Sequence, residues 1–169
     1  DSLTGLLNSE TTRLRIGQQL DALAGGERGA LLVVDVDCFK DVNDTHGHLV
    51  GDLVLADIAR ILRENFRIGD VVGRLGGDEF MVYLDRVGST DVVLGKCDRL
   101  RRAVERHEYP GTDCRVTISV GVVLAHAGDT FDDLYGRADE ALYAAKRDGR
   151  NRCGLADGAL RSPKAAPAP

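Results

Sequence analysis

The sequence lacks the features that mark membrane, secreted and nucleic-acid-binding proteins. Its 169 residues contain no apolar run near the ~20 residues of a membrane span, and no secretory signal stands at the start. The four cysteines form no Cys-x-x-Cys pair, which favours reduced thiols over a disulfide framework or a zinc site. Basic residues number 22 against 27 acidic ones, so the net charge is −5. We therefore expect a cytoplasmic domain with no nucleic-acid partner.

The residues that are present fit one globular domain. The chain is 43% hydrophobic and 29% charged, which is enough apolar material to bury a full core. We expect residues 1–155 to form the domain and residues 156–169, rich in alanine and proline, to be a disordered tail. Because the first residue is not methionine, we expect the chain to be part of a longer protein.

Hydrophobic periodicity alternates between helical and strand patterns. It predicts helices over residues 9–23, 50–66, 93–107 and 131–149, the first capped by Asn8 or Ser9. Apolar and β-branched runs predict strands at residues 31–34, 71–74, 80–84 and 115–124, with a hairpin turn at residues 76–77. Residues 39–52 are polar and are expected to form a loop. The predicted fold is an α/β (α+β) sandwich, with a mixed central sheet of about five strands flanked by helices.

Two pairs of carboxylates stand where predicted strands end. Asp35 and Asp37 are two residues apart, so we expect both side chains on the same face of the sheet. Asp78 and Glu79 follow the glycine turn. Clustered carboxylates need a cation, and oxygen-only ligands favour Mg²⁺ or Mn²⁺. Solvated turn acids are the alternative, which we favour for Asp78 taken alone, whereas the two pairs together favour a metal site.

The segment 39–52 carries groups that suit a nucleotide. Backbone N–H groups of a strand-to-helix turn can bind phosphate, and Lys40 adds a positive charge. Asn43 and Asp52 supply an amide and a carboxylate, which match the N1–H and N2–H₂ donors of guanine and not the edge of adenine. The alternative is an ordinary polar loop in which Asp52 caps a helix.

Two further charged pairs allow both a local and a functional interpretation. Lys146 and Arg150 lie one turn apart at the end of the last predicted helix, where they either interact with the helix dipole or hold a triphosphate. Arg67 and Asp70 form either an exposed ion pair of little energetic value or an arginine, oriented by the aspartate, that stacks on a purine and contacts phosphate.

Taken together, the motifs resemble the GGDEF family of diguanylate cyclases. The segment Arg74-Leu75-Gly76-Gly77-Asp78-Glu79-Phe80 contains the family signature. The other matches, in family order, are Asp1-x-Leu3-Thr4-Gly5-Leu6-x-Asn8, Asp35-x-Asp37-x-Phe39-Lys40-x-x-Asn43-Asp44, Gly47-His48-x-x-Gly51-Asp52, Thr117-Ile118-Ser119-Val120-Gly121, and Ala138-Asp139-x-Ala141-Leu142-Tyr143-x-Ala145-Lys146 with Gly149-Arg150-Asn151. The resemblance covers the chain to about Cys153. It implies a fold like the catalytic domain of class III nucleotide cyclases and the polymerase palm.

The resemblance also implies an activity and its partners. Family members join two GTP into cyclic di-GMP and release two pyrophosphates. Each domain holds one GTP, so a second copy of the domain, in a homodimer, is needed for turnover. An N-terminal sensor or receiver domain is expected to precede this fragment, and it would decide whether the full-length protein is free in the cytoplasm or anchored to a membrane.

Site residues follow from the same resemblance. Asp35, Asp78 and the Val36 carbonyl match the ligands of two Mg²⁺ ions, with Mn²⁺ as an alternative; Asp78 and Glu79 match the catalytic carboxylates. The implied substrate-binding residues are Asn43 and Asp52 for guanine, His48 for the nucleotide, Cys38, Phe39 and Lys40 for phosphates, and Lys146 and Arg150 for the γ- and β-phosphates. Arg67 and Asp70 match an inhibitory site for the product, cyclic di-GMP. Its second arginine is expected among Arg99, Arg101, Arg102 and Arg106.

Three alternatives stay open at this point. A non-catalytic module could bind GTP or cyclic di-GMP and regulate a partner, although such relatives usually have a degraded signature and this one is intact. An enzyme with relaxed base choice is disfavoured by Asp52. A nucleic-acid polymerase shares palm-like chemistry, but the acidic charge balance and small size argue against it.

Overall fold

A five-stranded mixed sheet forms the centre of the computed structural model, which describes residues 1–110 and 112–156. The strand order is β2-β3-β1-β4-β5, with β1 antiparallel to both β3 and β4, and β5 parallel to β4. The strands are β1 (Arg28–Val36), β2 (Val71–Gly76), β3 (Glu79–Leu84), β4 (Ile118–His126) and β5 (Cys153–Leu155). The predicted fold class is confirmed. The predicted tail lies outside the described residues from position 157 onward.

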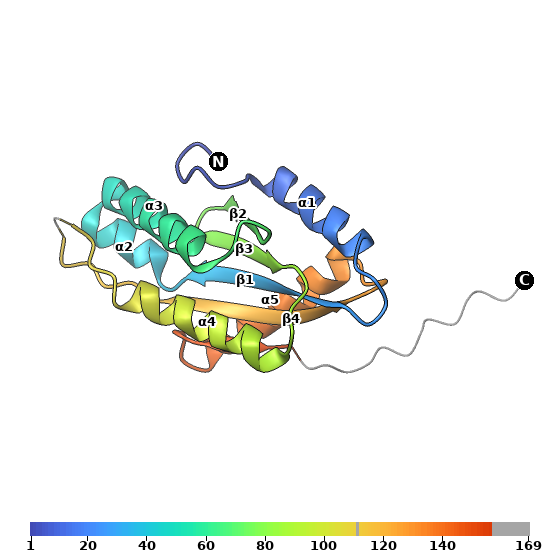
Figure 1. The fold of residues 1–169 in the computed structure, drawn as a ribbon. Helices are drawn as coiled ribbons and strands as arrows, with labels where there is room; N and C mark the ends of the chain where they lie inside the picture. Colours follow the sequence, from blue (N-terminus) through green and yellow to red (C-terminus); the bar gives the residue numbers. More distant parts are fainter. Residues whose placement is uncertain (111, 157–169) are drawn as a thin grey trace, which may run out of the picture.

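Helices cover both faces of the sheet (Figure 1). On one face, α3 and α4 pack on the side chains of Leu32 and Val34 from β1, and α2 packs against α3. On the other face, α1 and α5 pack on Leu31 and Val33. Alternate residues of β1 therefore enter two separate cores, which explains its continuous apolar sequence. The helices are α1 (Ser9–Asp21), α2 (Phe39–His46), α3 (His48–Asn65), α4 (Thr90–Glu105) and α5 (Phe131–Arg147).

The structure corrects the predicted elements at several boundaries. Residues 39–46, expected as a loop, form α2, in which Val42 is the one buried residue. The first helix is capped by Asn8, one of the two predicted caps, but ends at Asp21. The N–H of Ala22 donates to the Gln18 carbonyl, and the N–H of Leu23 closes the end with a tighter bond to the Leu20 carbonyl. β4 begins at Ile118, three residues later than predicted, and β5 had no counterpart among the predicted strands.

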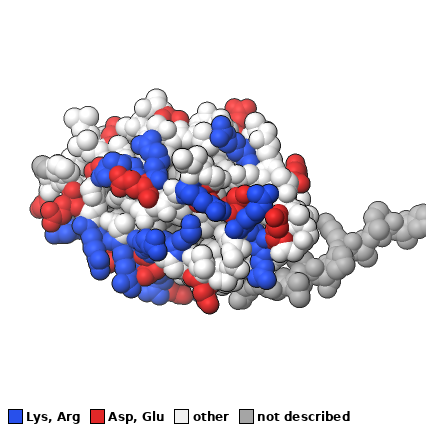
Figure 2. All heavy atoms as spheres, in the orientation of Figure 1, with Lys and Arg blue, Asp and Glu red and all other residues white. Residues whose placement is uncertain are grey.

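Charged side chains of both signs lie on the face seen in Figure 2, and the basic ones gather in its lower left part. Among the described residues, no helix has the length and apolar character needed to cross a membrane. All four cysteines are free thiols, as the sequence predicted.

Candidate functional site

The site is built around Asp35, the second-last residue of β1. In the sheet Asp35 pairs with Glu79 of β3 on one side and with Ser119 of β4 on the other. Its side chain is 9% exposed, and its Oδ2 atom accepts a 2.8 Å hydrogen bond from Nζ of Lys146, in the last turn of α5. The fold thus places an aspartate and a lysine that are far apart in sequence into one ion pair at the end of the central strand.

Burial and mutual repulsion destabilise the negative charges of this cluster. Burial raises the pKa of Asp35, and the nearby carboxylates of Asp78 and Asp37 add to the effect, although Lys146 opposes it. Burial likewise raises the pKa of Glu79, with further contributions from Asp35 and Asp78. Carboxylates held together in this way favour a bound cation, because a cation relieves both the repulsion and the loss of hydration.

The turn between β2 and β3 is held against the end of β1. Gly76 and Gly77 have φ of 146° and 53°, which only glycine adopts readily. The guanidinium of Arg74 donates to the Gly77 carbonyl at 2.7 and 3.1 Å and pairs with Asp1 at 3.2 Å. The N–H of Val36 donates to the carbonyl of Asp78 at 3.3 Å, which brings Asp78 beside the end of β1. Arg74 had no predicted role, and its place two residues before Gly76 was the available signal.

Asp37 is occupied by hydrogen bonds within the protein. Its Oδ1 accepts from the Ser119 hydroxyl at 2.6 Å, and its Oδ2 accepts from the Thr117 hydroxyl at 2.6 Å and from the N–H of Asn151 at 3.0 Å. Asp37 therefore ties the end of β1 to β4 and to the segment after α5. Asp35, in contrast, is paired with the ammonium group of the Lys146 side chain.

Asn43 and Asp52 lie in the two helices that follow β1. Asn43 lies in α2 and Asp52 in the first turns of α3, with Gly47 at φ 83° between the helices. A Cβ atom at Gly51 would lie 2.0 Å from Oδ1 of Asn43, so the Asn43 amide fills the space left by the missing side chain. Asn43 therefore lies against the residue next to Asp52, as the hypothesis of a shared guanine site requires.

The N-terminus of α2 supplies backbone donors beside the carboxylates. The first hydrogen bonds of this helix run from Asp41 and Val42 to the carbonyl of Cys38, so the earlier N–H groups have no acceptor inside the helix. Cys38 adopts a left-handed conformation with φ 55°, and Lys40 is exposed in the first turn. His48 is exposed at the start of α3.

The donors around Asp35 suit a hard divalent cation. Among the described residues no three side chains of His, Cys, Asp and Glu form a metal site by themselves. Two carboxylates, from Asp35 and Asp78, and the carbonyl of Val36 instead offer a partial oxygen shell. This fits Mg²⁺, which usually keeps several waters and shares its shell with substrate phosphates.

Comparison with known proteins agrees with this arrangement. A family model described as "Diguanylate cyclase, GGDEF domain" matches residues 1–152. The chain belongs to the GGDEF family. It is 40% identical over 153 residues to diguanylate cyclase DgcM of Escherichia coli K12, covering 90% of this chain, and 39% identical over 139 residues to diguanylate cyclase A of Treponema denticola, covering 80%. The chain spans 37% of the length of each of these curated relatives.

Solved GGDEF domains share the fold. The GGDEF domain of DgcB from Caulobacter crescentus, solved in complex with c-di-GMP, superposes with a TM-score of 0.86 at 32% identity, over 93% of this chain and 92% of that one. The GGDEF domain of PA1120 (TpbB or YfiN) from Pseudomonas aeruginosa gives 0.86 at 38% identity, over 93% and 94%. The palm-like architecture of nucleotide cyclases is therefore the fold of this GGDEF domain.

Arg67 and Asp70 lie beside a cavity away from the carboxylate cluster. Nε of Arg67 donates to the buried Asp70 at 3.1 Å, and the guanidinium also donates to the carbonyl of Asp85. The cavity has a volume of about 340 Å³, and its lining includes Arg15 and Arg63 besides Arg67. The sequence analysis did not single out Arg15 or Arg63, since nothing in their local sequence marks them.

The structure gives further contacts for the charged residues named above. On α4, Nζ of Lys96 lies 4.0 Å from Oδ2 of Asp70, and the second arginine of the product site stays unassigned. Of the arginines considered, Arg101 is instead bonded to Asp98, Glu105 and Asn151. Arg150 does not lie at the end of the last helix, because α5 ends at Arg147 and the chain then turns through left-handed residues.

Proposed function

We propose that this GGDEF domain is the catalytic domain of a diguanylate cyclase, which condenses two GTP into cyclic di-GMP and two pyrophosphates. The observation that carries the proposal is the group of carboxylates Asp35, Asp78 and Glu79 at the end of β1. Asp35 pairs with Lys146, and the first N–H groups of α2, which have no acceptor inside the helix, follow in the chain. Relatives named as diguanylate cyclases at about 40% identity support it.

The proposed reaction joins two identical phosphodiester-forming steps. In each, the 3′-hydroxyl oxygen of one GTP forms a bond to the α-phosphorus of the other, the bond from that phosphorus to the bridging oxygen breaks, and pyrophosphate leaves. The hydroxyl proton passes to a nearby base, for which Asp78 and Glu79 are the candidates. Two Mg²⁺ ions held by Asp35, Asp78 and the Val36 carbonyl would supply charge neutralisation at the phosphates. Mn²⁺ has the same ligand preference.

The other site residues bind and orient GTP. The Asp52 carboxylate and the amide oxygen of Asn43 accept from the N–H donors of the guanine edge, and His48 contacts the nucleotide. The N–H groups of Cys38 and Phe39 bind phosphate oxygens, while the cations Lys40, Lys146 and Arg150 contact the phosphates. Because each domain supplies the ligands of a single GTP, turnover requires a homodimer of domains. Positioning two substrates and balancing charge account for most of the catalysis expected here.

The test is the formation of cyclic di-GMP from GTP and Mg²⁺, followed by mass spectrometry over a range of protein concentrations. Asp78→Asn and Glu79→Gln keep side-chain shape and remove charge, and should abolish product. Asp21→Asn is the matched control, since this exposed aspartate lies at the opposite end of β1 from Asp35. A rate that rises faster than linearly with concentration supports the homodimer.

The alternative function is a regulatory module that binds GTP or cyclic di-GMP without turnover. Fusion of the domain to a parallel coiled coil forces two copies together and separates the two hypotheses. Product from the fused wild type, and none from fused Asp78→Asn, supports the cyclase. Nucleotide binding without product, in a fused protein that is folded and dimeric, would overturn it in favour of the regulatory module.

A further inference from the structure

The segment after α5 has an unusual backbone. Gly149, Arg150 and Asn151 follow one another with φ of 116°, 60° and 47°. A left-handed conformation is unfavourable for a residue with a side chain, although asparagine is among the least penalised. Two such residues in a row persist only where the surrounding structure holds them.

Part of the restraint is the ordinary end of a helix. The N–H of Arg150 donates to the carbonyl of Ala145 at 3.1 Å, which closes the last turn of α5. On the other side, the carbonyl of Arg152 accepts from the N–H of Val120, which starts the pairing of β5 with β4. These bonds hold Arg150 and Arg152, the two neighbours of Asn151. The conformation of Asn151 depends on its own hydrogen bonds.

Asn151 uses three polar groups to bind two different parts of the fold. Its backbone N–H donates to Asp37 at 3.0 Å, directly after β1. Its side-chain Nδ2 donates to Oε1 of Glu105 at 2.6 Å, and its Oδ1 accepts from Arg101 at 2.9 Å, both on α4. The hydrogen bond from Asn151 is the main reason that the pKa of Glu105 lies below its usual range, and Arg101 contributes next.

The position of Arg150 gives these bonds a functional meaning. Arg150 is exposed, and no hydrogen bond or ion pair of its guanidinium is described, so among the described contacts the fold holds Arg150 through its backbone. That backbone is held on one side by α5, whose Lys146 contacts Asp35, and on the other by Asn151.

We propose that Asn151 is a positioning residue, which holds Arg150 toward the phosphates of GTP by linking its backbone to Asp37 and to α4. The proposal rests on the proposed phosphate-binding role of Arg150. It implies that the side-chain bonds from Asn151 to Glu105 and Arg101 contribute to GTP affinity although they touch no ligand. The contribution should depend on the β- and γ-phosphates, because Arg150 is the group that Asn151 orients.

The experiment measures the affinity of the 169-residue protein for GTP and for GMP by titration calorimetry in Mg²⁺. Asn151→Gly is the informative variant, because glycine adopts φ near 47° without strain and keeps the N–H to Asp37, losing only the bonds to α4. We expect GTP affinity to fall about tenfold, as for residues that orient a ligand-binding group, and GMP affinity to be unchanged. Arg147→Ala removes an equal charge from an exposed side chain three residues earlier and is the control.

A double-mutant cycle decides whether Asn151 acts through Arg150. If it does, Asn151→Gly causes no further loss of GTP affinity in an Arg150→Ala background. Full additivity, equal losses for GTP and GMP, or wild-type GTP affinity of Asn151→Gly would each overturn the inference. If Arg150→Ala alone leaves GTP affinity unchanged, the phosphate-binding role of Arg150 fails first, and the two failures are thereby distinguished.

A milder variant covers the case in which Asn151→Gly does not fold. Glu105→Gln keeps an acceptor for Nδ2 of Asn151 and removes only the charge, on a side chain that is 41% exposed. We expect a smaller loss of affinity, about two- to threefold, again for GTP and not for GMP. Unchanged GTP affinity in folded Glu105→Gln would then overturn the proposal.

Discussion

Nζ of Lys146 lies 2.8 Å from Oδ2 of Asp35, so an ammonium group neutralises the carboxylate that is proposed to bind metal. The pair joins the last turn of α5 to the end of β1. Lys146 is 34% exposed, whereas Asp35 is 9% exposed. The lysine can therefore swing toward solvent or phosphate when a divalent cation takes its place, whereas the aspartate stays fixed in the sheet.

The first prediction concerns Lys146→Met, which removes the ammonium group and keeps the length of the side chain. Asp35 then has no neighbouring cation, and we expect the free energy of unfolding to fall by about 1–2 kcal/mol in the absence of divalent cations. Mg²⁺ should restore much of this lost stability. Thermal denaturation of wild type and Lys146→Met, each with and without Mg²⁺, measures the change in Tm.

The control for this prediction carries Lys146→Met together with Asp78→Asn. This protein lacks the second carboxylate, so its Tm should respond little to Mg²⁺. If the Tm of Lys146→Met rises with Mg²⁺ no more than that of the wild type, Asp35 does not hold the metal.

The second prediction uses the glycine beside Asn43. In Gly51→Ala the new Cβ atom would lie 2.0 Å from Oδ1 of Asn43, so the amide must move. Alanine favours a helix by about 1 kcal/mol over glycine, and displacement of a flexible side chain costs little, so stability should change only slightly. If Asn43 reads guanine, the preference for GTP over ATP should fall by about tenfold.

Gly95→Ala is the matched control for Gly51→Ala. Gly95 lies in α4, and no atom stands within 4 Å of the position that its Cβ would take. Gly95→Ala should stabilise α4 through the higher helix propensity of alanine and leave nucleotide affinity unchanged. Calorimetric titration of both variants with GTP and ATP measures the preference, and an unchanged ratio in Gly51→Ala would remove Asn43 from the guanine site.

Much of the sheet could be predicted because β1, β2, β3 and β4 each carry their own sequence signal. The apolar run of β1 and the glycines between β2 and β3 specify structure within a few residues. α2 could not be predicted in this way, because Val42 is its one buried residue and its stability comes from packing on α3. β5 has only three residues, and it exists because β4 offers an edge with which it can pair.

Candidate site residues could be proposed from the sequence where the residue type itself suggests the chemistry. Contacts between residues far apart in the chain could not be proposed in this way. The carboxylates at strand ends and the pair Asn43 and Asp52 could be proposed from spacing alone. The partner of Asp35 could not, because an ion pair with Lys146 depends on how α5 packs across the sheet. For the same reason Lys96 was missed, since the distance from α4 to Asp70 is a property of the folded chain.

The third prediction concerns the proposed product site. Arg67→Ala removes the guanidinium that Asp70 orients at the edge of the cavity. We expect the affinity for cyclic di-GMP to fall by about 100-fold, since charge-assisted bonds to phosphate are lost. Lys96→Ala should cause a smaller loss, because its distance from Asp70 is 4.0 Å.

Titration of each variant with cyclic di-GMP measures these losses, with GTP affinity as the reference for intact folding. Arg147→Ala, which removes an exposed arginine in the last turn of α5, should leave cyclic di-GMP affinity unchanged. Unaltered product binding and unaltered product inhibition in Arg67→Ala would exclude the proposed inhibitory site.

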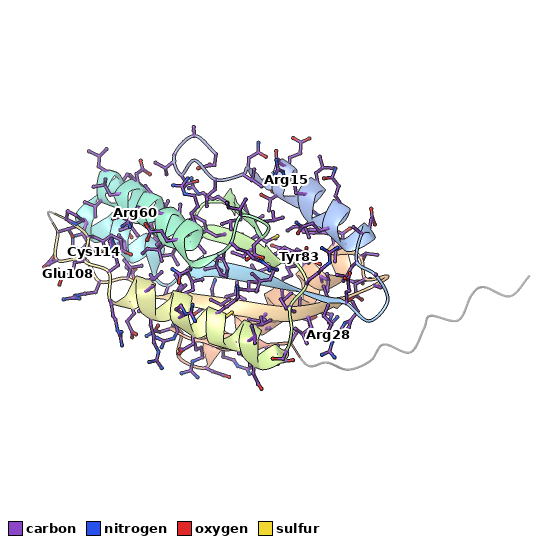
Figure 3. The ribbon with its side chains drawn as sticks, in the orientation of Figure 1. Arg15, Arg28, Arg60, Tyr83, Glu108 and Cys114 are labelled. Carbon is purple, nitrogen blue, oxygen red and sulfur yellow. The ribbon has the colours of Figure 1, made fainter. Side chains whose placement is uncertain are left out.

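The fourth prediction concerns Asp57 of α3, which contacts His107, two residues after the end of α4. Its other partner, Arg60, is labelled in Figure 3. Burial opposes ionisation of the Asp57 carboxyl, but hydrogen bonds from His107 at 2.9 Å and Arg60 at 3.2 Å outweigh burial and lower the pKa of Asp57. A carboxylate with a lowered pKa contributes stability above its unfolded pKa of about 3.9 and loses it as pH falls through the folded value.

Asp57→Asn should therefore lower the free energy of unfolding at pH 7 by about 1 kcal/mol. The difference in free energy of unfolding between Asp57→Asn and wild type should disappear below about pH 4. Glu64→Gln, which alters another carboxylate bonded to Arg60, should have a smaller effect because that side chain is 59% exposed. Urea denaturation of the three proteins at several pH values provides the comparison. A gap between Asp57→Asn and wild type that stays constant down to pH 3 would mean that the hydrogen bonds of Asp57, and not its charge, stabilise the fold.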